Sequence, residues 1–188
     1  MKKIFRGIGL FFWDILQMAV LAATIFIISY LFFFQPHQVI GNSMGPNFED
    51  REYLLTDKIS YRFHKPQRGD VVIFKSPPDP EKDYIKRIVG LPGEKIKIQG
   101  GKVFINDRLL NENYLSQGAP VSPGVFLREG QEIKIPDDSY IVFGDNRSNS
   151  FDSRSWGPVP AKDIIGRAFL RYWPLEKLNL IKEATYAF

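Results

Sequence analysis

The sequence predicts a mainly β protein, in which an N-terminal transmembrane helix precedes one domain of mostly antiparallel strands. Three observations lead to this prediction. Residues 15–34 form a run without a charged residue, which is long enough to cross a bilayer. After Pro36 the pattern changes to short segments rich in Val, Ile, Phe and Tyr, separated by turn residues, as is typical of strands. No stretch outside the apolar run has a helical period, so a β domain is expected to follow.

The apolar run is interpreted as a membrane anchor. As a helix, residues 15–34 would be about 30 Å long, which matches the hydrocarbon core of a bilayer. Three cations lie among the first six residues, whereas residues 35–50 contain no Lys or Arg. The positive-inside rule therefore places residues 1–14 in the cytoplasm and the domain of residues 35–188 outside a cell membrane that is crossed once.

Two other interpretations of this run fit less well. A cleaved signal peptide would have an apolar core of about 7–15 residues followed by a small-x-small site, but this run ends in Leu-Phe-Phe-Phe-Gln-Pro. A buried helix of a soluble protein would usually be shorter and interrupted by charged residues. We therefore expect the lipid bilayer to be a partner of the chain.

The composition narrows the kinds of site that are possible. The chain has no cysteine, which excludes a cysteine nucleophile, a thiolate metal site and disulfide bonds. Its net charge of +4 arises from cations and anions interspersed along the sequence, so we expect no nucleic-acid partner. Its 188 residues suffice for one span and one domain with its own core.

Eight segments after the anchor are predicted as strands from their β-branched and aromatic residues. They are residues 53–59, 70–75, 84–90, 94–99, 102–106, 131–135, 139–144 and 164–173. Pro92-Gly93 suits a type II turn, and Gly100-Gly101 between two alternating runs indicates a hairpin. Residues 111–130 have the least pattern and are predicted as a long loop or a small insertion.

The two histidines and one acidic loop do not predict a metal site or a Ser-His-Asp triad. His37 lies directly outside the anchor and His64 lies in a polar turn, so both are expected to be solvated or interfacial, without the carboxylate partner that a triad needs. Residues 145–152 contain two carboxylates, but Arg147 and Arg154 in the same region supply opposing charge, which disfavours calcium. We expect no metal and no cofactor.

After these exclusions, the remaining type of catalytic centre is a hydroxyl nucleophile with a base other than histidine. A lysine can be that base if burial lowers its pKa from about 10.4 towards neutrality, whereas arginine keeps its proton. The chain has eleven serines and many lysines, so spacing alone selects no Ser-Lys pair. Lys86 shares a strand face with Tyr84 and Ile88, but Arg87 has equally apolar neighbours on the other face. The alternation of strand faces therefore does not distinguish Lys86 from Arg87.

Four segments form an ordered set behind the anchor. They are a Ser-Met-x-Pro box in residues 41–46, an Arg-Gly-Asp strand in 68–74, a lysine box in 84–94 and a C-terminal box in 144–154. In type and order this set resembles the bacterial type I signal peptidases, which are Ser/Lys serine proteases. The resemblance implies a coiled, antiparallel β catalytic domain with a small inserted β region, here residues 100–136.

The resemblance also implies roles for individual residues. Ser43 would be the nucleophile and Lys86 the general base. The backbone N–H of Ser43 would be one oxyanion donor, but Gly41 occupies the position where some relatives have a second, hydroxyl donor, so that donor stays open. The supporting residues would be Ser150 hydrogen-bonded to the Lys86 amine, Asp152 paired with Arg154, and Asp145 as a brace.

Substrates and partners follow from the same resemblance. The substrates would be preproteins that are cut after small-x-small motifs, and the secretion machinery is an expected partner. A substrate could add as a strand beside residues 83–85. Shallow apolar pockets would be formed by Val39, Ile40, Met44, Tyr84 and Ile85. Asn47 stands where the family usually has Thr, and we expect it to make a similar local hydrogen bond.

Two other functions are compatible with these residues. One is another Ser-Lys protease of the same broad fold, either a processing peptidase dedicated to one partner or a self-cleaving repressor, although the anchor argues against a repressor. The other is a membrane-tethered β domain that binds or scaffolds without catalysis. The presence of both Ser43 and Lys86 argues against the second alternative.

Overall fold

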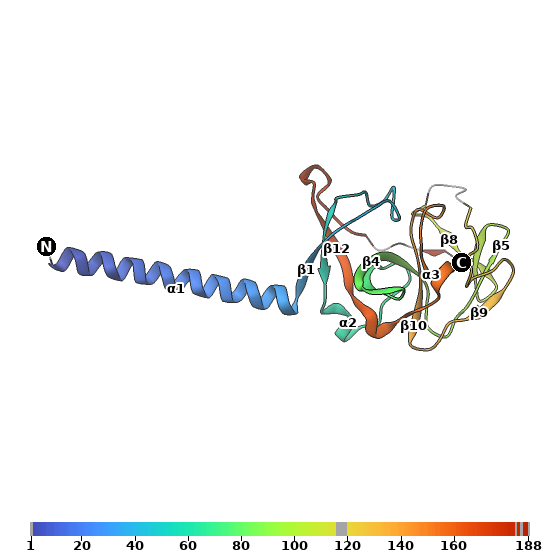
Figure 1. Ribbon diagram of the computed structural model, residues 1–188, viewed down its shortest axis with the longest axis horizontal. Coiled ribbons are helices and arrows are strands. Elements are labelled where there is room, and N and C mark those ends of the chain that lie inside the picture. The colour runs from blue at the N-terminus through green and yellow to red at the C-terminus, as the bar shows by residue number, and fades with distance from the viewer. Residues whose placement is uncertain (1, 116–119, 183, 185, 188) are drawn as a thin grey trace.

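The protein consists of a long N-terminal helix attached to a β domain, as Figure 1 shows. The computed structural model describes residues 2–115, 120–182, 184, 186 and 187. The helices are α1 (Lys2–Phe32), α2 (Ser60–Phe63) and α3 (Ser153–Trp156), with 3-10 turns η1 (Ala161–Asp163) and η2 (Leu175–Lys177). The strands are β1 (Phe34–Gln38), β2 (Tyr53–Asp57), β3 (Val71–Ser76), β4 (Asp79–Gly90), β5 (Lys95–Gln99), β6 (Lys102–Ile105), β7 (Arg108–Leu109), β8 (Asn111–Glu112), β9 (Glu132–Lys134), β10 (Ser139–Phe143), β11 (Val159–Pro160), β12 (Ile164–Trp173), β13 (Asn179–Leu180) and β14 (Tyr186–Ala187).

The helix α1 contains the apolar run. Its segment Gly9–Tyr30 has a mean hydropathy of 2.0, and none of that segment is buried by the rest of the protein. By length and composition it could cross a bilayer. The prediction that the helix continues to Phe34 is wrong, because Phe34 already belongs to β1 and pairs with Asp57 of β2. Pro36 follows closely and favours extended backbone before it.

An eight-stranded antiparallel sheet forms the body of the domain, which confirms the predicted fold class. Its strand order is β1-β2-β12-β3-β4-β10-β11, and β13 pairs with β12. A four-stranded sheet, β7-β6-β5-β9, and a two-stranded sheet, β14-β8, complete the domain. β4 lies between β3 and β10 in the large sheet, and its C-terminal half is buried on both faces, where Ile88 and Val89 belong to two different apolar clusters. That half carries Lys86.

The four-stranded sheet corresponds to the predicted inserted region. Gly100 and Gly101 have φ values of +58° and +72° and connect β5 to β6, which confirms the predicted hairpin. The sheet itself begins with β5 at Lys95, five residues before the start of the predicted region. The predicted loop of residues 111–130 contains β8, which pairs with β14 near the C-terminus; residues 116–119 of that loop lie outside the described part of the chain.

The prediction of no helix beyond the anchor is wrong at two single turns, α2 and α3. Asp57 precedes α2, and its carboxylate accepts hydrogen bonds from the N–H groups of Ile59 (2.8 Å) and Ser60 (3.0 Å). Asp152 precedes α3 and accepts from the N–H of Arg154. One turn is too short to show a helical period, so the capping carboxylates were the only local signal.

One apolar cluster positions the segment that follows β1. Its buried members include Val39, Met44, Phe48, Leu54 and Val71. They come from β2, β3 and the loop between β1 and β2. The cluster therefore packs the loop that carries Ser43 against the large sheet.

Candidate active site

Ser43 lies in a loop whose base and apex are both held. At the base, Val39 N–H donates to Glu52 O at 2.8 Å. Near the apex, the side chains of Met44 and Phe48 are 0% and 4% exposed. These two buried side chains follow Ser43 in the loop and hold its backbone, while the residue itself is only half-buried.

Lys86 reaches Ser43 from the buried half of β4. Its Nζ lies 2.7 Å from Ser43 Oγ and donates to Ile85 O at 2.9 Å. The residue is 4% exposed, and burial lowers the pKa of its amine to about 8, although the nearby charges of Asp152 and Asp145 act in the opposite direction. A serine hydroxyl thus contacts an amine that can be neutral near physiological pH.

Arg87, the other candidate of the strand, is equally buried but is fully paired. It is 4% exposed and forms two hydrogen bonds with Asp145, from Nε to Oδ1 (2.9 Å) and from Nη2 to Oδ2 (2.6 Å). Its Nη1 donates to Gly69 O at 2.9 Å. The alternation of strand faces could not distinguish Lys86 from Arg87. Their partners do, because of the two only Lys86 contacts a serine.

The loop after β10 closes over the Ser43 backbone. Asn146 N–H donates to Ser43 O at 3.0 Å, and Asn146 Nδ2 donates to Asn42 O at 3.0 Å. A side chain at Gly144 would collide with Ser43 O and Ser150 Oγ. Only glycine therefore permits this close approach of the two loops.

Of the contacts that the resemblance implied for this loop, the structure forms one and does not form another. Asp152 and Arg154 form a buried pair with two side-chain contacts of 2.8 Å each, as predicted. The expected hydrogen bond from Ser150 to the Lys86 amine is not formed: Ser150 Oγ is buried and has no hydrogen-bond partner within the described part of the chain. The amine instead uses Ser43 Oγ and the carbonyl of its own neighbour, Ile85.

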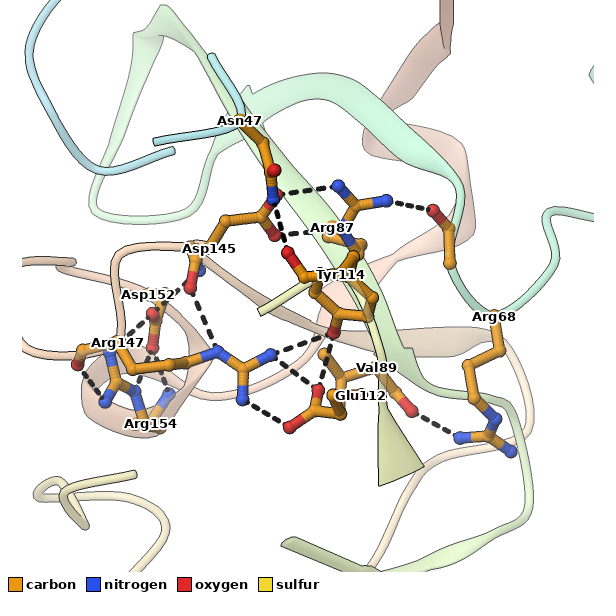
Figure 2. A network of polar contacts seen from close by, with 12 residues as sticks. Asn47, Arg68, Arg87, Val89, Glu112, Tyr114, Asp145, Arg147, Asp152 and Arg154 are labelled. Carbon is orange, nitrogen blue, oxygen red and sulfur yellow. Dashed lines mark hydrogen bonds and ion pairs between the residues drawn. The ribbon is translucent and has the colours of Figure 1, made fainter. Parts of the chain in front are cut away.

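Figure 2 shows a wider network, part of which the sequence analysis missed. Arg147 binds Glu112 through Nη1 (2.7 Å) and Nη2 (2.5 Å), and its Nη2 also lies 2.9 Å from Tyr114 Oη. From the sequence, Arg147 is expected only to supply a charge that disfavours calcium binding. Glu112 lies 35 residues away in the chain, so no local pattern could have indicated this pair.

Asn47 does not make the local hydrogen bond that we expected. Its Nδ2 donates to Asp145 Oδ2 at 2.9 Å and to Tyr114 O at 3.0 Å, and both acceptors come from distant segments. The side chain points away from its own loop towards these segments, as Figure 2 shows. Asn47 therefore joins the Ser43 loop to the rest of the site.

The oxyanion donors are partly defined by the backbone. Within the described residues, the N–H of Ser43 donates no hydrogen bond, so it remains available to a substrate oxyanion. The N–H of Gly41 is not available, because it donates to Asp50 Oδ1 at 2.7 Å. Gly41 also has a φ of +83°, a left-handed conformation that disfavours a serine at this position.

The five predicted pocket residues do not all line one surface. Val39 and Met44 are 3% and 0% exposed, so neither offers much surface to a substrate as the loop stands. Ile85 packs partly buried against them, whereas Tyr84 packs against a different cluster. Ile40 is 82% exposed. The residues with surface to offer are therefore Ile40, Tyr84 and Ile85.

The histidines provide no rival catalytic centre. His37 was expected to be solvated or interfacial, and its ring is part-buried, with Nδ1 2.9 Å from Thr56 Oγ1 and Nε2 3.6 Å from Asp83, because β1 lies against β2. This excludes a fully solvated ring and does not test an interfacial position. The hydroxyl that it contacts is therefore Thr56, a buried strand residue, and not Ser43. His64 is exposed. The described residues include no cluster of three His, Asp or Glu side chains that could hold a metal.

Comparison with known proteins gives consistent matches. A family model described as "Signal peptidase, peptidase S26" matches residues 12–173. The Bacillus subtilis protein "Signal peptidase I U" is 35% identical over 174 residues, covering 89% of this chain and 90% of that protein. All four sequence boxes lie within the matched residues.

Two further relatives are longer than the segment they share with this chain. The Synechocystis protein "Probable signal peptidase I-2" is 40% identical over 149 residues, which cover 76% of this chain and 65% of that protein. The Arabidopsis thaliana protein "Thylakoidal processing peptidase 1, chloroplastic" is 37% identical over 155 residues, covering 77% of this chain and 44% of that protein. The chain thus spans less than two thirds of the length of both relatives.

Proposed function

Because this chain belongs to the signal peptidase family, peptidase S26, we propose that it is a membrane-anchored serine endopeptidase that removes signal peptides from exported preproteins. The observation that carries the proposal is the 2.7 Å contact between Ser43 Oγ and the buried amine of Lys86. A neutral amine can accept the hydroxyl proton, and a paired or solvated lysine could not do so at neutral pH.

In the proposed mechanism, Ser43 Oγ attacks the scissile carbonyl while Lys86 Nζ takes its proton. The oxyanion of the tetrahedral intermediate accepts from the free N–H of Ser43, and one such donor contributes about 3–4 kcal/mol in related acyl transfer. Lys86 then protonates the leaving amine. The acyl-enzyme is released by a water molecule that the neutral amine deprotonates. No metal or cofactor takes part.

The anchor would hold the catalytic domain at the membrane, next to its substrates. With the cations of the first six residues inside and α1 across the cell membrane, the β domain lies outside, where signal peptides emerge from the secretion machinery. A signal peptide keeps its apolar region in the membrane, so an extended segment beside residues 83–85 would present its small residues to Ile40, Tyr84 and Ile85. Side chains one and three residues before the cut face the same wall.

The test is cleavage of a synthetic preprotein by the purified full-length chain, with the cut site read by mass spectrometry. We expect cleavage after Ala-x-Ala and almost none when Phe replaces the last Ala, and Ser43→Ala should be inactive. A dedicated processing peptidase, the class suggested by the name of the plant relative, would cut only one member of a panel of preproteins. A chain that cuts none of them and takes up no acylating inhibitor at Ser43 would be a non-catalytic β domain.

A further inference from the structure

Asn47 is the residue of the Ser43 loop whose side chain crosses to the other half of the site. Its Nδ2 donates to Asp145 Oδ2 (2.9 Å) and to Tyr114 O (3.0 Å). Both amide hydrogens are therefore used. The orientation of the amide is determined by these partners, because a reversed amide would place its oxygen against two other oxygens.

The carboxylate of Asp145 is shared between the two halves of the site. Its side chain is fully buried, and it accepts from Arg87 Nε (2.9 Å), Arg87 Nη2 (2.6 Å) and Asn47 Nδ2 (2.9 Å). Figure 2 shows Asn47 and Arg87 meeting at this one group. Arg87 directly follows Lys86 in β4, and Asn47 lies four residues after Ser43. Each member of the catalytic pair is thus tied to Asp145 through a near neighbour in the chain.

We propose that Asn47 is a positioning residue, which acts through Asp145 to hold the Ser43 loop against β4 and so sets the distance between Ser43 Oγ and Lys86 Nζ. The inference rests on the proposed function, since it takes Ser43 and Lys86 as the reacting pair. Their contact of 2.7 Å is sensitive to small shifts of the loop, because a displacement of about 1 Å can cost about 100-fold in rate.

Replacement of Asn47 should therefore slow the chemical step more than it weakens substrate binding. Asn47→Leu keeps the approximate volume and removes both donors, and Asn47→Ala removes them without adding bulk. For either variant we expect kcat to fall about 10- to 100-fold, with KM within about threefold of wild type because no pocket residue changes. Asn47→Thr restores one donor and should recover part of the loss.

A matched control separates positioning from general stability. Asn106 Oδ1 accepts from Lys95 N–H at 2.9 Å in the small sheet, outside the site. Asn106→Ala should lower the melting temperature of the full-length chain and leave kcat unchanged when activity is measured well below that temperature. Asn47→Ala should lower kcat under the same conditions.

The decisive experiment is a double-mutant cycle of Asn47→Ala with Asp145→Asn, measured as kcat of the full-length chain on one preprotein. If Asn47 acts through Asp145, the double variant should be about as slow as the slower single variant. Penalties that multiply, or a folded Asn47→Ala variant with the kcat of wild type, would overturn the proposal. Failure of the proposed function is distinguishable, because the wild-type chain would then show no Ser43-dependent cleavage against which the cycle could be measured.

Discussion

Lys86 and Arg87 are adjacent in β4 and equally buried, yet their surroundings have opposite effects on their charge. Burial alone would lower the pKa of Arg87, but the hydrogen bonds and charge of Asp145 outweigh it and raise that pKa. Lys86 Nζ meets the neutral oxygens of Ser43 and Ile85, and burial lowers its pKa to about 8. The two faces of one strand thus hold a permanent cation and a titratable amine.

The comparison shows that pairing, and not burial, decides what a buried cation can do. Arg87, Arg147 and Arg154 each have a carboxylate partner within 2.8 Å, as buried charges normally require. Lys86 forms no ion pair among the described residues. An unpaired buried lysine costs stability, and its position beside a serine supports the proposed role of Lys86 as the base.

The largest effect should come from removing the unpaired amine. Lys86→Ala and Lys86→Arg should each lower kcat/KM by several orders of magnitude, because the serine then has no base. Lys102→Ala, which removes an exposed lysine of β6, is the control and should match wild type. A Lys86→Arg variant with activity within about tenfold of wild type would show that Lys86 is not the general base.

Removing the partner of Arg87 should lower the stability of the protein as well as kcat. Asp145→Asn leaves a buried guanidinium uncompensated, so we expect the free energy of unfolding to fall by about 3–5 kcal/mol in denaturant titrations. Asp107→Asn, at an exposed pair with Lys97, should change stability by less than about 0.5 kcal/mol. Equal stabilities for the two variants would mean that the buried pair is not a structural element.

The same comparison predicts that Lys86→Met stabilises the protein while inactivating it. The pKa of Lys86 falls from 10.5 to about 8 on folding, so the folded state carries a penalty of up to about 3 kcal/mol below pH 8. The penalty is fully present at pH 7 and disappears as the pH rises above 10.5. We expect Lys86→Met to gain about 1–3 kcal/mol at pH 7, and a gain that does not shrink at alkaline pH would contradict this origin.

The smallest effect should come from the histidines. His37 contacts Thr56 and Asp83, and His64 is exposed. Replacement of both by Ala should leave kcat/KM within about threefold of wild type. A loss of 100-fold or more in a folded double variant would indicate that a histidine takes part.

The sequence predicted the strand that carries Lys86 but could not separate that residue from Arg87 by pattern. Both faces of the C-terminal half of β4 are buried, since Ile88 and Val89 pack into two different apolar clusters, so alternation carries no information there. Only the resemblance to signal peptidases selected Lys86. The contacts that distinguish the two cations come from Ser43 and Asp145, which lie 43 and 58 residues away in the chain.

Other contacts of the site could not be predicted from the sequence, because they also join residues that lie far apart in the chain. The pair of Asp152 and Arg154 was implied by the resemblance, and the structure forms it. The partners of Asn47 and Arg147 were not predicted, because Tyr114 and Glu112 lie 67 and 35 residues away from them in the chain. The hydrogen bond predicted from Ser150 to Lys86 depended on the resemblance alone, and the geometry of this chain directs the amine to Ser43 and Ile85 instead.

The most direct test of the account is the pH dependence of kcat/KM between pH 5 and pH 10. A base that must be neutral gives a rate that rises with pH and levels off above the pKa of Lys86 in the free enzyme, about 8. The negative charge of Asp145 raises that pKa, so Asp145→Asn should move the rise to lower pH. A profile that is flat across this range, or a rise on the acid side of neutrality that vanishes when both histidines are replaced, would contradict the assignment of Lys86 as the unpaired base.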